Sequence, residues 1–224
     1  AIERAEDALT LEGYNGGSIV SEGNLTLLLS QNNRITVEGA YAYGINVKGR
    51  LRINKTDSDT GDTLTISTRA DMTRYGGYLI SADDTVMEGG TLNLSTLGAD
   101  MLYVAVIGDF TLRGAANLKS ELTGDFNNSD VLYLESSGTT DILAAEGDSQ
   151  YNMVVDMLAV RGSGPVSIET VNTKKKRAAI GFLKEYTGTS RLTVKGGPVG
   201  LETVYNRATT REDMCVTSLT DNRY

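Results

Sequence analysis

One short pattern recurs along this chain and limits the folds open to it. An aliphatic residue is followed four positions later by Gly or Asp, and then by β-forming residues at alternate positions. The copies begin at Ile19, Ile45, Ile80, Val104, Leu134 and Val160, and successive starts lie 24 to 35 residues apart. A period of this length is typical of stacked arrays, in which one unit cannot bury its apolar face alone.

A second alternating run follows most copies of the pattern. These runs are Ile35-Thr-Val37, Leu64-Thr-Ile66, Leu92-Asn-Leu94 and Ala116-Asn-Leu118, with Met153-Val-Val155 as a further candidate. Alternation of apolar and polar residues is typical of a pleated strand. Residues 19–171 sustain no helical apolar stripe, so the chain is predicted to be all-β. Several short strands per period favour a parallel β-helix, and an antiparallel sandwich or jelly roll is the alternative.

The fold prediction is therefore a right-handed parallel β-helix of about seven coils, with the first aliphatic of each copy in one internal column. Right-handedness follows from the strong bias of parallel crossover connections. Residues near the start show helix-like apolar spacing, and the repeat dissolves after Val204. We accordingly expect a single domain, 1–224, that consists of an N-terminal cap, the coils and a C-terminal cap over 1–9, 10–204 and 205–224.

Composition narrows the partners. The formal net charge of −8 argues against nucleic acid, because phosphate binding draws on clustered Lys and Arg. The basic cluster at 174–177 is interpreted as a solvated loop, with contact to an anionic polymer as the alternative. The longest apolar run, Met101 to Ile107, is far shorter than the roughly 20 residues of a membrane span, so none is expected. The single cysteine, Cys215, permits no internal disulfide.

The chain contains no histidine, which excludes Ser-His-Asp and Cys-His catalysis and histidine metal ligation. Asp83-Asp84 could supply the two carboxylates of a glycosidase, and a β-helix with such a pair resembles the polygalacturonases. Their Gly-His-Gly element is missing, and Asp84 occupies a repeat position that is elsewhere glycine. We therefore predict that the protein is not an enzyme. A pectate-lyase-like enzyme is the less favoured alternative, because Arg52, Arg113 and Arg161 lie in no specific motif.

Two turns place oxygen-bearing side chains two or three residues apart, as Ca²⁺ requires. The predicted calcium ligands are Asp57, Asp59 and Asp62 in the first turn and Asp125, Asn127 and Asp130 in the second. Neither turn matches the full EF-hand loop. Plain turns are the alternative, since Asp and Asn side chains often bond the nearby backbone.

The residue patterns of the first repeats resemble those of a known class of proteins. Leu9-Thr-Leu11-Glu-Gly13-Tyr-Asn-Gly-Gly-Ser-Ile19, Gly23-Asn-Leu-Thr-Leu27 and Gly44-Ile-Asn-Val-Lys-Gly49 resemble bacterial surface proteins of the carbohydrate-binding domain-containing type. The resemblance covers about residues 9–120 and rests on repeat phrasing rather than a catalytic signature. It implies an extracellular, secreted or cell-surface β-helix without catalytic activity. A plant or host polysaccharide would be its ligand, with calcium as a candidate ion.

Tyrosines supply the candidate binding surface, because sugar rings stack on exposed aromatic faces and the chain has no Trp. Tyr43 and Tyr78 each precede the first aliphatic of a copy by two residues, so they would stack on successive coils about 4.8 Å apart. The predicted ligand-binding residues are Tyr41, Tyr43, Tyr75 and Tyr78. A structural tyrosine ladder is the alternative, and with it a structural or adhesive surface protein.

Overall fold

The computed structural model describes the chain in segments. The described residues are 6–39, 42–56, 61–68, 77–96, 104–122, 126–144, 154–170, 185–188, 192–195, 205–206 and 214–217. Every regular element within them is a β-strand. The prediction of an all-β chain is confirmed for this part of the molecule.

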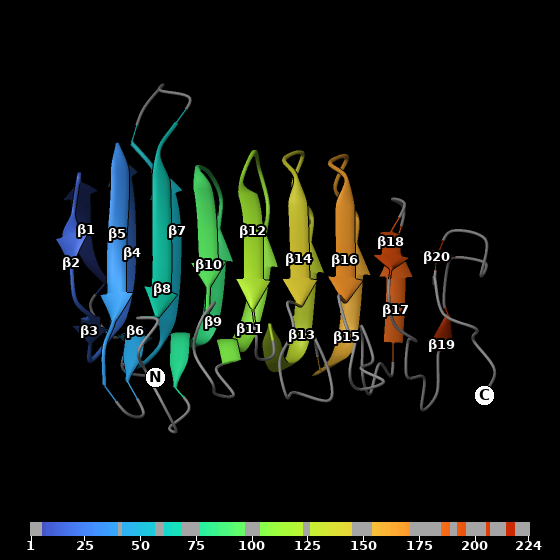
Figure 1. Ribbon diagram of the computed structural model, residues 1–224, viewed down its shortest axis with the longest axis horizontal. Helices are drawn as coiled ribbons and strands as arrows, with labels where there is room; N and C mark the ends of the chain where they lie inside the picture. The colour runs from blue at the N-terminus through green and yellow to red at the C-terminus, as the bar shows by residue number, and fades with distance from the viewer. Residues whose placement is uncertain are drawn as a thin grey trace.

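The strands form two parallel sheets that run side by side along the molecule (Figure 1). The main path of sheet A contains β1 (Glu6–Glu12), β4 (Asn24–Ser30), β7 (Arg50–Lys55), β9 (Tyr78–Met87), β11 (Val104–Leu112), β13 (Asn127–Leu134), β15 (Val154–Val160), β17 (Glu185–Gly188) and β19 (Tyr205–Asn206). Two short strands, β3 (Ile19–Ser21) and β6 (Tyr43–Val47), also belong to it. Sheet B contains β2 (Asn15–Gly16), β5 (Asn32–Val37), β8 (Thr63–Thr68), β10 (Thr91–Ser95), β12 (Asn117–Leu122), β14 (Thr140–Ala144), β16 (Val166–Thr170), β18 (Leu192–Lys195) and β20 (Met214–Thr217).

Each strand on the main path of sheet A is followed in the chain by a strand of sheet B, and we call such a pair a rung. Neighbouring rungs pair strictly in parallel, for example β4 with β7 and β5 with β8. The stack holds nine such pairs within the described residues, against the seven or so coils that the repeat predicts. This stacking of parallel strands is compatible with a β-helix.

Alternating burial explains why these segments form strands. In β4 the residues Leu25, Leu27 and Leu29 are almost fully buried, and the residues between them are half-buried. In β8 the buried apolar residues are Leu64 and Ile66. Apolar residues of both sheets belong to one continuous hydrophobic cluster. The core therefore runs along the stack between the sheets, as alternation in a two-layer structure predicts.

The predicted single internal column is wrong in its second half. Ile19, Ile45 and Ile80 are register partners, but the next partner of Ile80 is Val106, and Val104 pairs with Tyr78. Leu134 and Val160 belong to another column, which contains Ile53, Met87 and Leu112.

The physical reason is that one sequence pattern serves two corners. In the first four copies it spans the bend within sheet A, as from β3 into β4. In the last two it spans the corner from sheet A into sheet B, as from Leu134 into β14. At both corners an aliphatic residue is followed four positions later by Gly or Asp, so the pattern alone cannot distinguish the two corners.

The predicted ends also differ from the structure. The helix-like spacing over 1–9 does not give a helix in residues 6–9, because these belong to β1 and pair in parallel with β4. Within the expected irregular C-terminal cap, β19 and β20 continue the two sheets. Strand pairing to the neighbouring rung therefore outweighs the weak local signals at both ends.

Candidate ligand-binding site

Two of the predicted tyrosines meet. Tyr43 in β6 and Tyr78 in β9 are register partners on neighbouring strands, and their ring centroids lie 5.5 Å apart at an interplanar angle of 31°. Both residues are partly exposed. A tilted pair at this spacing is a favourable aromatic contact and presents one continuous aromatic surface across two strands. The next register partner along the stack is Val104, which interrupts the aromatic row.

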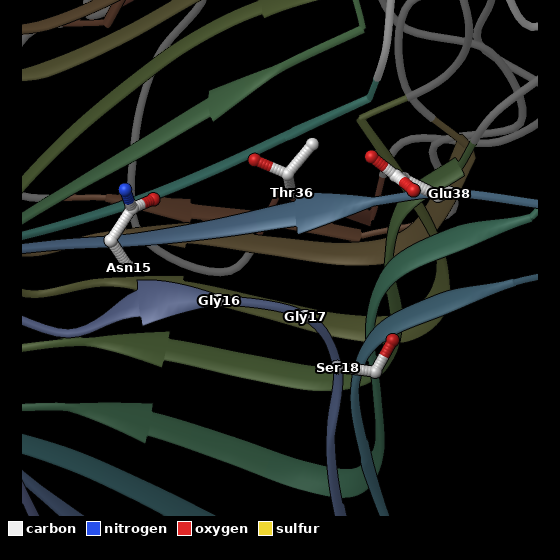
Figure 2. A pocket seen from close by; sticks show the side chains of 6 residues that line it. All are labelled: Asn15, Gly16, Gly17, Ser18, Thr36 and Glu38. Atoms are coloured by element: carbon white, nitrogen blue, oxygen red, sulfur yellow. The ribbon is translucent and has the colours of Figure 1, made fainter.

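A polar notch lies next to the strand that carries Tyr43. It has a volume of about 350 Å³ and is lined by Asn15, Gly16, Gly17, Ser18, Thr36 and Glu38. Figure 2 shows Thr36 on β5 and Glu38 just after its end, with the other lining residues on β2 and the chain segment that follows it. The hydroxyl of Ser18 donates a hydrogen bond to the backbone carbonyl of Tyr43, so one wall of the notch is joined directly to the strand that carries the tyrosine.

The notch exists because β2 leaves β5 early. The two strands pair only at Asn15 with Arg34 and at Gly16 with Ile35. A Cβ on Gly16 would lie 2.6 Å from the ring of Tyr14, so a side chain at this position would displace that ring. The Tyr14 hydroxyl donates to the carbonyl of Gly17 at 3.1 Å and holds the departing segment in place.

The lining defines what the notch can bind. Asn15 offers an amide, Ser18 and Thr36 offer hydroxyls, and Glu38 offers a carboxylate. These groups can donate to and accept from the hydroxyls of a sugar. Sequence reasoning missed the notch, although Gly16-Gly17 between two alternating runs is a signal for a break in strand pairing.

Most of the other residues predicted to bind a ligand or calcium are not covered by the described part of the chain. Tyr41, Tyr75, Asp57, Asp59 and Asp125 lie outside the described residues. Asn127 and Asp130 are part of β13, and their side chains are outside the described part of the chain. Asp62 is nearly buried, and its Oδ1 accepts a hydrogen bond of 2.8 Å from the backbone N–H of Gln31. The carboxylate thus supports the turn at Gln31, which has a positive φ of 65°.

Asp62 is one of several Asp and Asn side chains that join neighbouring rungs. The Oδ1 atoms of Asn24, Asn33, Asp109 and Asn117 accept hydrogen bonds from the backbone N–H groups of Arg50, Tyr14, Val131 and Thr139, at 2.9 to 3.1 Å. Each link satisfies a backbone donor at a corner or a shift in register, where the strand ladder is interrupted. For Asp62 the structure shows the turn-supporting role that the sequence left as the alternative to calcium binding.

No group of three or more acidic or cysteine residues that could hold a metal ion occurs within the described ranges. Calcium binding at the two predicted turns stays a prediction, because most of their residues lie outside those ranges.

A row of paired charges lies just beyond the ends of four strands of sheet A. Glu88, Arg113, Glu135 and Arg161 directly follow the buried register column of Met87, Leu112, Leu134 and Val160. Both Nε and Nη2 of Arg113 donate to Glu88, Arg52 lies 3.5 Å from Glu88, and Arg161 lies 3.8 Å from Glu135. The hydrogen bonds from Arg113 are the main reason why the pKa of Glu88 is lowered. Partial burial opposes them, and the charges of Arg113 and Arg52 add to the lowering.

One residue of the predicted acid pair Asp83-Asp84 contacts a base on the neighbouring strand. Asp84 accepts a hydrogen bond of 2.8 Å from Nε of Arg50, whereas Asp83 is exposed. Arg50 is the register partner of Asp84 on β7. Asp84 is therefore part of a cross-strand ion pair on the face of sheet A.

Comparison with models of known protein families, with curated proteins and with solved structures gives no match. The described part of the chain also contains no helix long and apolar enough to cross a membrane.

Proposed function

We propose that this protein is a non-catalytic polysaccharide-binding β-helix of a bacterial surface, whose parallel sheets close into a right-handed solenoid. The observation that supports a binding function best is the Tyr43 and Tyr78 pair, with a polar notch whose Ser18 bonds the backbone of the Tyr43 strand. One part offers apolar ring faces and the other hydrogen-bonding groups, and saccharides present both kinds of surface. The resemblance of the first repeats to bacterial carbohydrate-binding surface proteins points the same way.

The proposed ligand is a neutral polysaccharide. The acidic side chain of Glu38 lines the notch, and the whole chain carries a net charge of −8, so a polyuronate or sulfated glycan would be repelled. Stacking on two tyrosines with a few hydrogen bonds should give micromolar to millimolar affinity, on the order of 4–8 kcal/mol.

The proposal that the protein is not an enzyme rests on a catalytic residue type that the chain lacks and on a carboxylate that is already paired. There is no histidine, and Asp84 is paired with Arg50. Purified protein should release neither reducing ends nor unsaturated uronides from polygalacturonate. Sustained release that disappears in Asp83→Asn or Asp84→Asn would establish the lyase or hydrolase alternative instead.

Affinity electrophoresis in gels that contain neutral plant or host polysaccharides tests the binding site. We expect Tyr43→Ala combined with Tyr78→Ala to abolish the retardation of the wild-type protein while circular dichroism stays unchanged. Tyr133→Ala is the matched control, because Tyr133 is a partly exposed tyrosine on another row of sheet A, in register with Thr111 and Ala159. Equal retardation of the double variant and the wild type would refute the site.

A structural or adhesive surface protein is the second candidate. The observation that favours it is the long parallel stack with its row of paired charges, which needs no ligand for a scaffolding role. A glycan array on which a folded protein binds nothing would favour this candidate over polysaccharide binding.

A further inference from the structure

The outward side of two strands in sheet B carries no charge. In both strands, buried apolar residues alternate with partly exposed polar ones. The outward residues, which we call the polar patch, are Thr63, Thr65 and Ser67 on β8 and Thr91, Asn93 and Ser95 on β10. Each of these side chains ends in a hydroxyl or an amide. Strand β8 lies between β5 and β10, and β10 lies between β8 and β12, so the polar patch is independent of both ends of the stack.

Sheet A presents different chemistry on the same rungs. Arg50 pairs with Asp84, and both Arg52 and Arg113 pair with Glu88. A sulfated or uronic acid polymer would gain no ion pair on the polar patch, whereas a neutral carbohydrate can exchange hydrogen bonds with its hydroxyls and amide. The polar patch therefore suits a neutral carbohydrate.

Register arranges the polar patch in rows that cross the strands. The three outward residues of β8 are the register partners of the three outward residues of β10. Neighbouring strands lie about 4.8 Å apart, so each row repeats at that interval along the stack. One sugar of an extended polysaccharide advances by a similar distance, on the order of 5 Å, because a zigzag of about four bonds of roughly 1.5 Å crosses its ring. A linear chain that runs along the stack can therefore place one sugar over each rung.

One of these rows begins in the notch. Thr36 lines the notch and lies on β5 in Figure 2. Its register partner on β8 is Ser67, whose partner on β10 is Ser95. A carbohydrate chain held in the notch can therefore continue across the polar patch without leaving the row.

Contacts between the strands hold part of this surface in one conformation. Oγ1 of Thr63 donates to Oδ1 of Asn32 at 2.9 Å, and Nδ2 of Asn93 donates to Oγ1 of Thr65 at 3.4 Å. Threonine is also restricted about χ1 by its branched Cβ. A surface that is ordered before binding loses little side-chain freedom when a ligand arrives, so weak contacts with single sugars can add up along a chain.

From the uncharged polar patch, its row spacing and its continuity with the notch we infer that the outward side of β5, β8 and β10 binds a linear neutral polysaccharide that crosses the rungs. The inference rests on the proposed function and specifies its ligand. The ligand is an unbranched polymer bound along its length, rather than a short oligosaccharide held by its end in the notch.

Affinity electrophoresis in gels that contain a linear neutral polysaccharide, either β-glucan, mannan or xylan, tests this surface. We expect Ser67→Lys combined with Ser95→Glu to raise the dissociation constant about tenfold or more, because two long side chains would fill the row. The new charges are opposite and lie on register partners, so the variant should fold. Ser167→Lys is the matched control, because Ser167 is a partly exposed serine of β16 in register with Asp141 and lies outside the polar patch.

Ser67→Ala combined with Ser95→Ala keeps the inference testable if the charged variant fails to fold. Loss of the two hydroxyls should raise the dissociation constant about threefold or more, as measured by calorimetry with the polysaccharide that retards the wild-type protein. Circular dichroism should stay unchanged.

The outcomes separate this inference from the proposed function. Retardation that disappears in the double variant of Tyr43 and Tyr78, but stays at the wild-type level in both double variants of Ser67 and Ser95, would overturn the inference and leave the proposed function in place. A wild-type protein that none of the three polysaccharides retards would overturn both.

Discussion

Two neighbouring rows of residues, one at the ends of the sheet A strands and one just beyond them, cross the same rungs and differ in burial and in charge. One is the interior column of Met87, Leu112, Leu134 and Val160, whose side chains are at most 1% exposed. The other is the charged row that immediately follows it, Glu88, Arg113, Glu135 and Arg161, whose side chains are 25 to 50% exposed.

The difference separates two requirements of a stacked fold. Burial of apolar surface is non-directional, so the interior column stabilises stacking without choosing between rungs of similar composition. A charged row is selective, because an acid gains a partner only when a base occupies the same position on the next rung. We therefore interpret the column as the main source of stability and the charged row as a source of correct register.

The largest expected effect breaks the column itself. Leu112→Ala should lower the free energy of unfolding by about 2–5 kcal/mol, because it removes buried methyl groups and leaves a cavity between Met87 and Leu134. Arg113→Ala, at the next residue after the strand ends, should cost less than about 1 kcal/mol. Urea unfolding of both variants measures the contrast. Similar losses in the free energy of unfolding of the two variants would show that the interior column is not the main source of stability.

The corner that follows these rows gives the next prediction. A Cβ on Gly162 would lie 2.0 Å from the carbonyl oxygen of Ser136, and that oxygen belongs to backbone that cannot move away cheaply. Gly162→Ala should therefore cost about 1–3 kcal/mol. Gly61→Ala is the control, since nothing lies within 4 Å of the added atom and Gly61 has no positive φ. A thermal melt of Gly162→Ala that matched the wild type would contradict the close approach.

The interior could be predicted from the sequence better than the corners. Alternation identified the buried residues of β4, β5, β8 and β10, because strand periodicity acts locally. The equivalence of Tyr43 and Tyr78 is confirmed as a register pairing, whereas their role in binding stays a prediction. The phase of the later copies was wrong, because Val104 pairs with Tyr78 rather than with Ile80 and the last two copies span the corner from sheet A into sheet B.

The charged row was missed for the same reason. Glu88 and Arg113 become neighbours only through the pairing of β9 with β11, and a one-residue slip would separate them. The notch was missed because it depends on where β2 stops pairing with β5, which is set by packing around Tyr14 and Gly16. Contacts between rungs depend on register, and a repeat with two similar corners does not fix register.

A second interior column contains a polar residue whose replacement should raise the stability of the fold. Thr85 lies fully buried between the apolar Leu51 and Phe110, and its hydroxyl has no hydrogen-bond partner in the structure. Thr85→Val keeps the shape of the side chain and removes this uncompensated polar group, so it should stabilise the fold by about 1 kcal/mol. An increase in the urea midpoint with an unchanged slope would confirm the gain. A loss of stability would show that the hydroxyl is satisfied in solution.

The smallest expected effect lies in the charged row and depends on pH. Since the pKa of Glu88 is lowered in the folded chain, its ion pairs stabilise the fold above the ordinary glutamate pKa of about 4.3. This contribution is lost as the pH falls through the lowered value. Glu88→Gln should therefore cost less than about 1 kcal/mol at neutral pH, where the exposed arginines limit the gain. The difference from the wild type should shrink to nothing in acid.

A double exchange, Glu88→Arg with Arg113→Glu, tests whether register selection resides in this row. It restores the ion pair between these two positions with opposite polarity. The arginine introduced at position 88 would, however, face Arg52, which pairs with Glu88 in the wild type. We therefore expect partial rescue relative to Glu88→Arg alone, measured as a double-mutant coupling in urea unfolding. If the coupling were zero, the row would be solvated charge, and register would be specified by the corners and the interior columns.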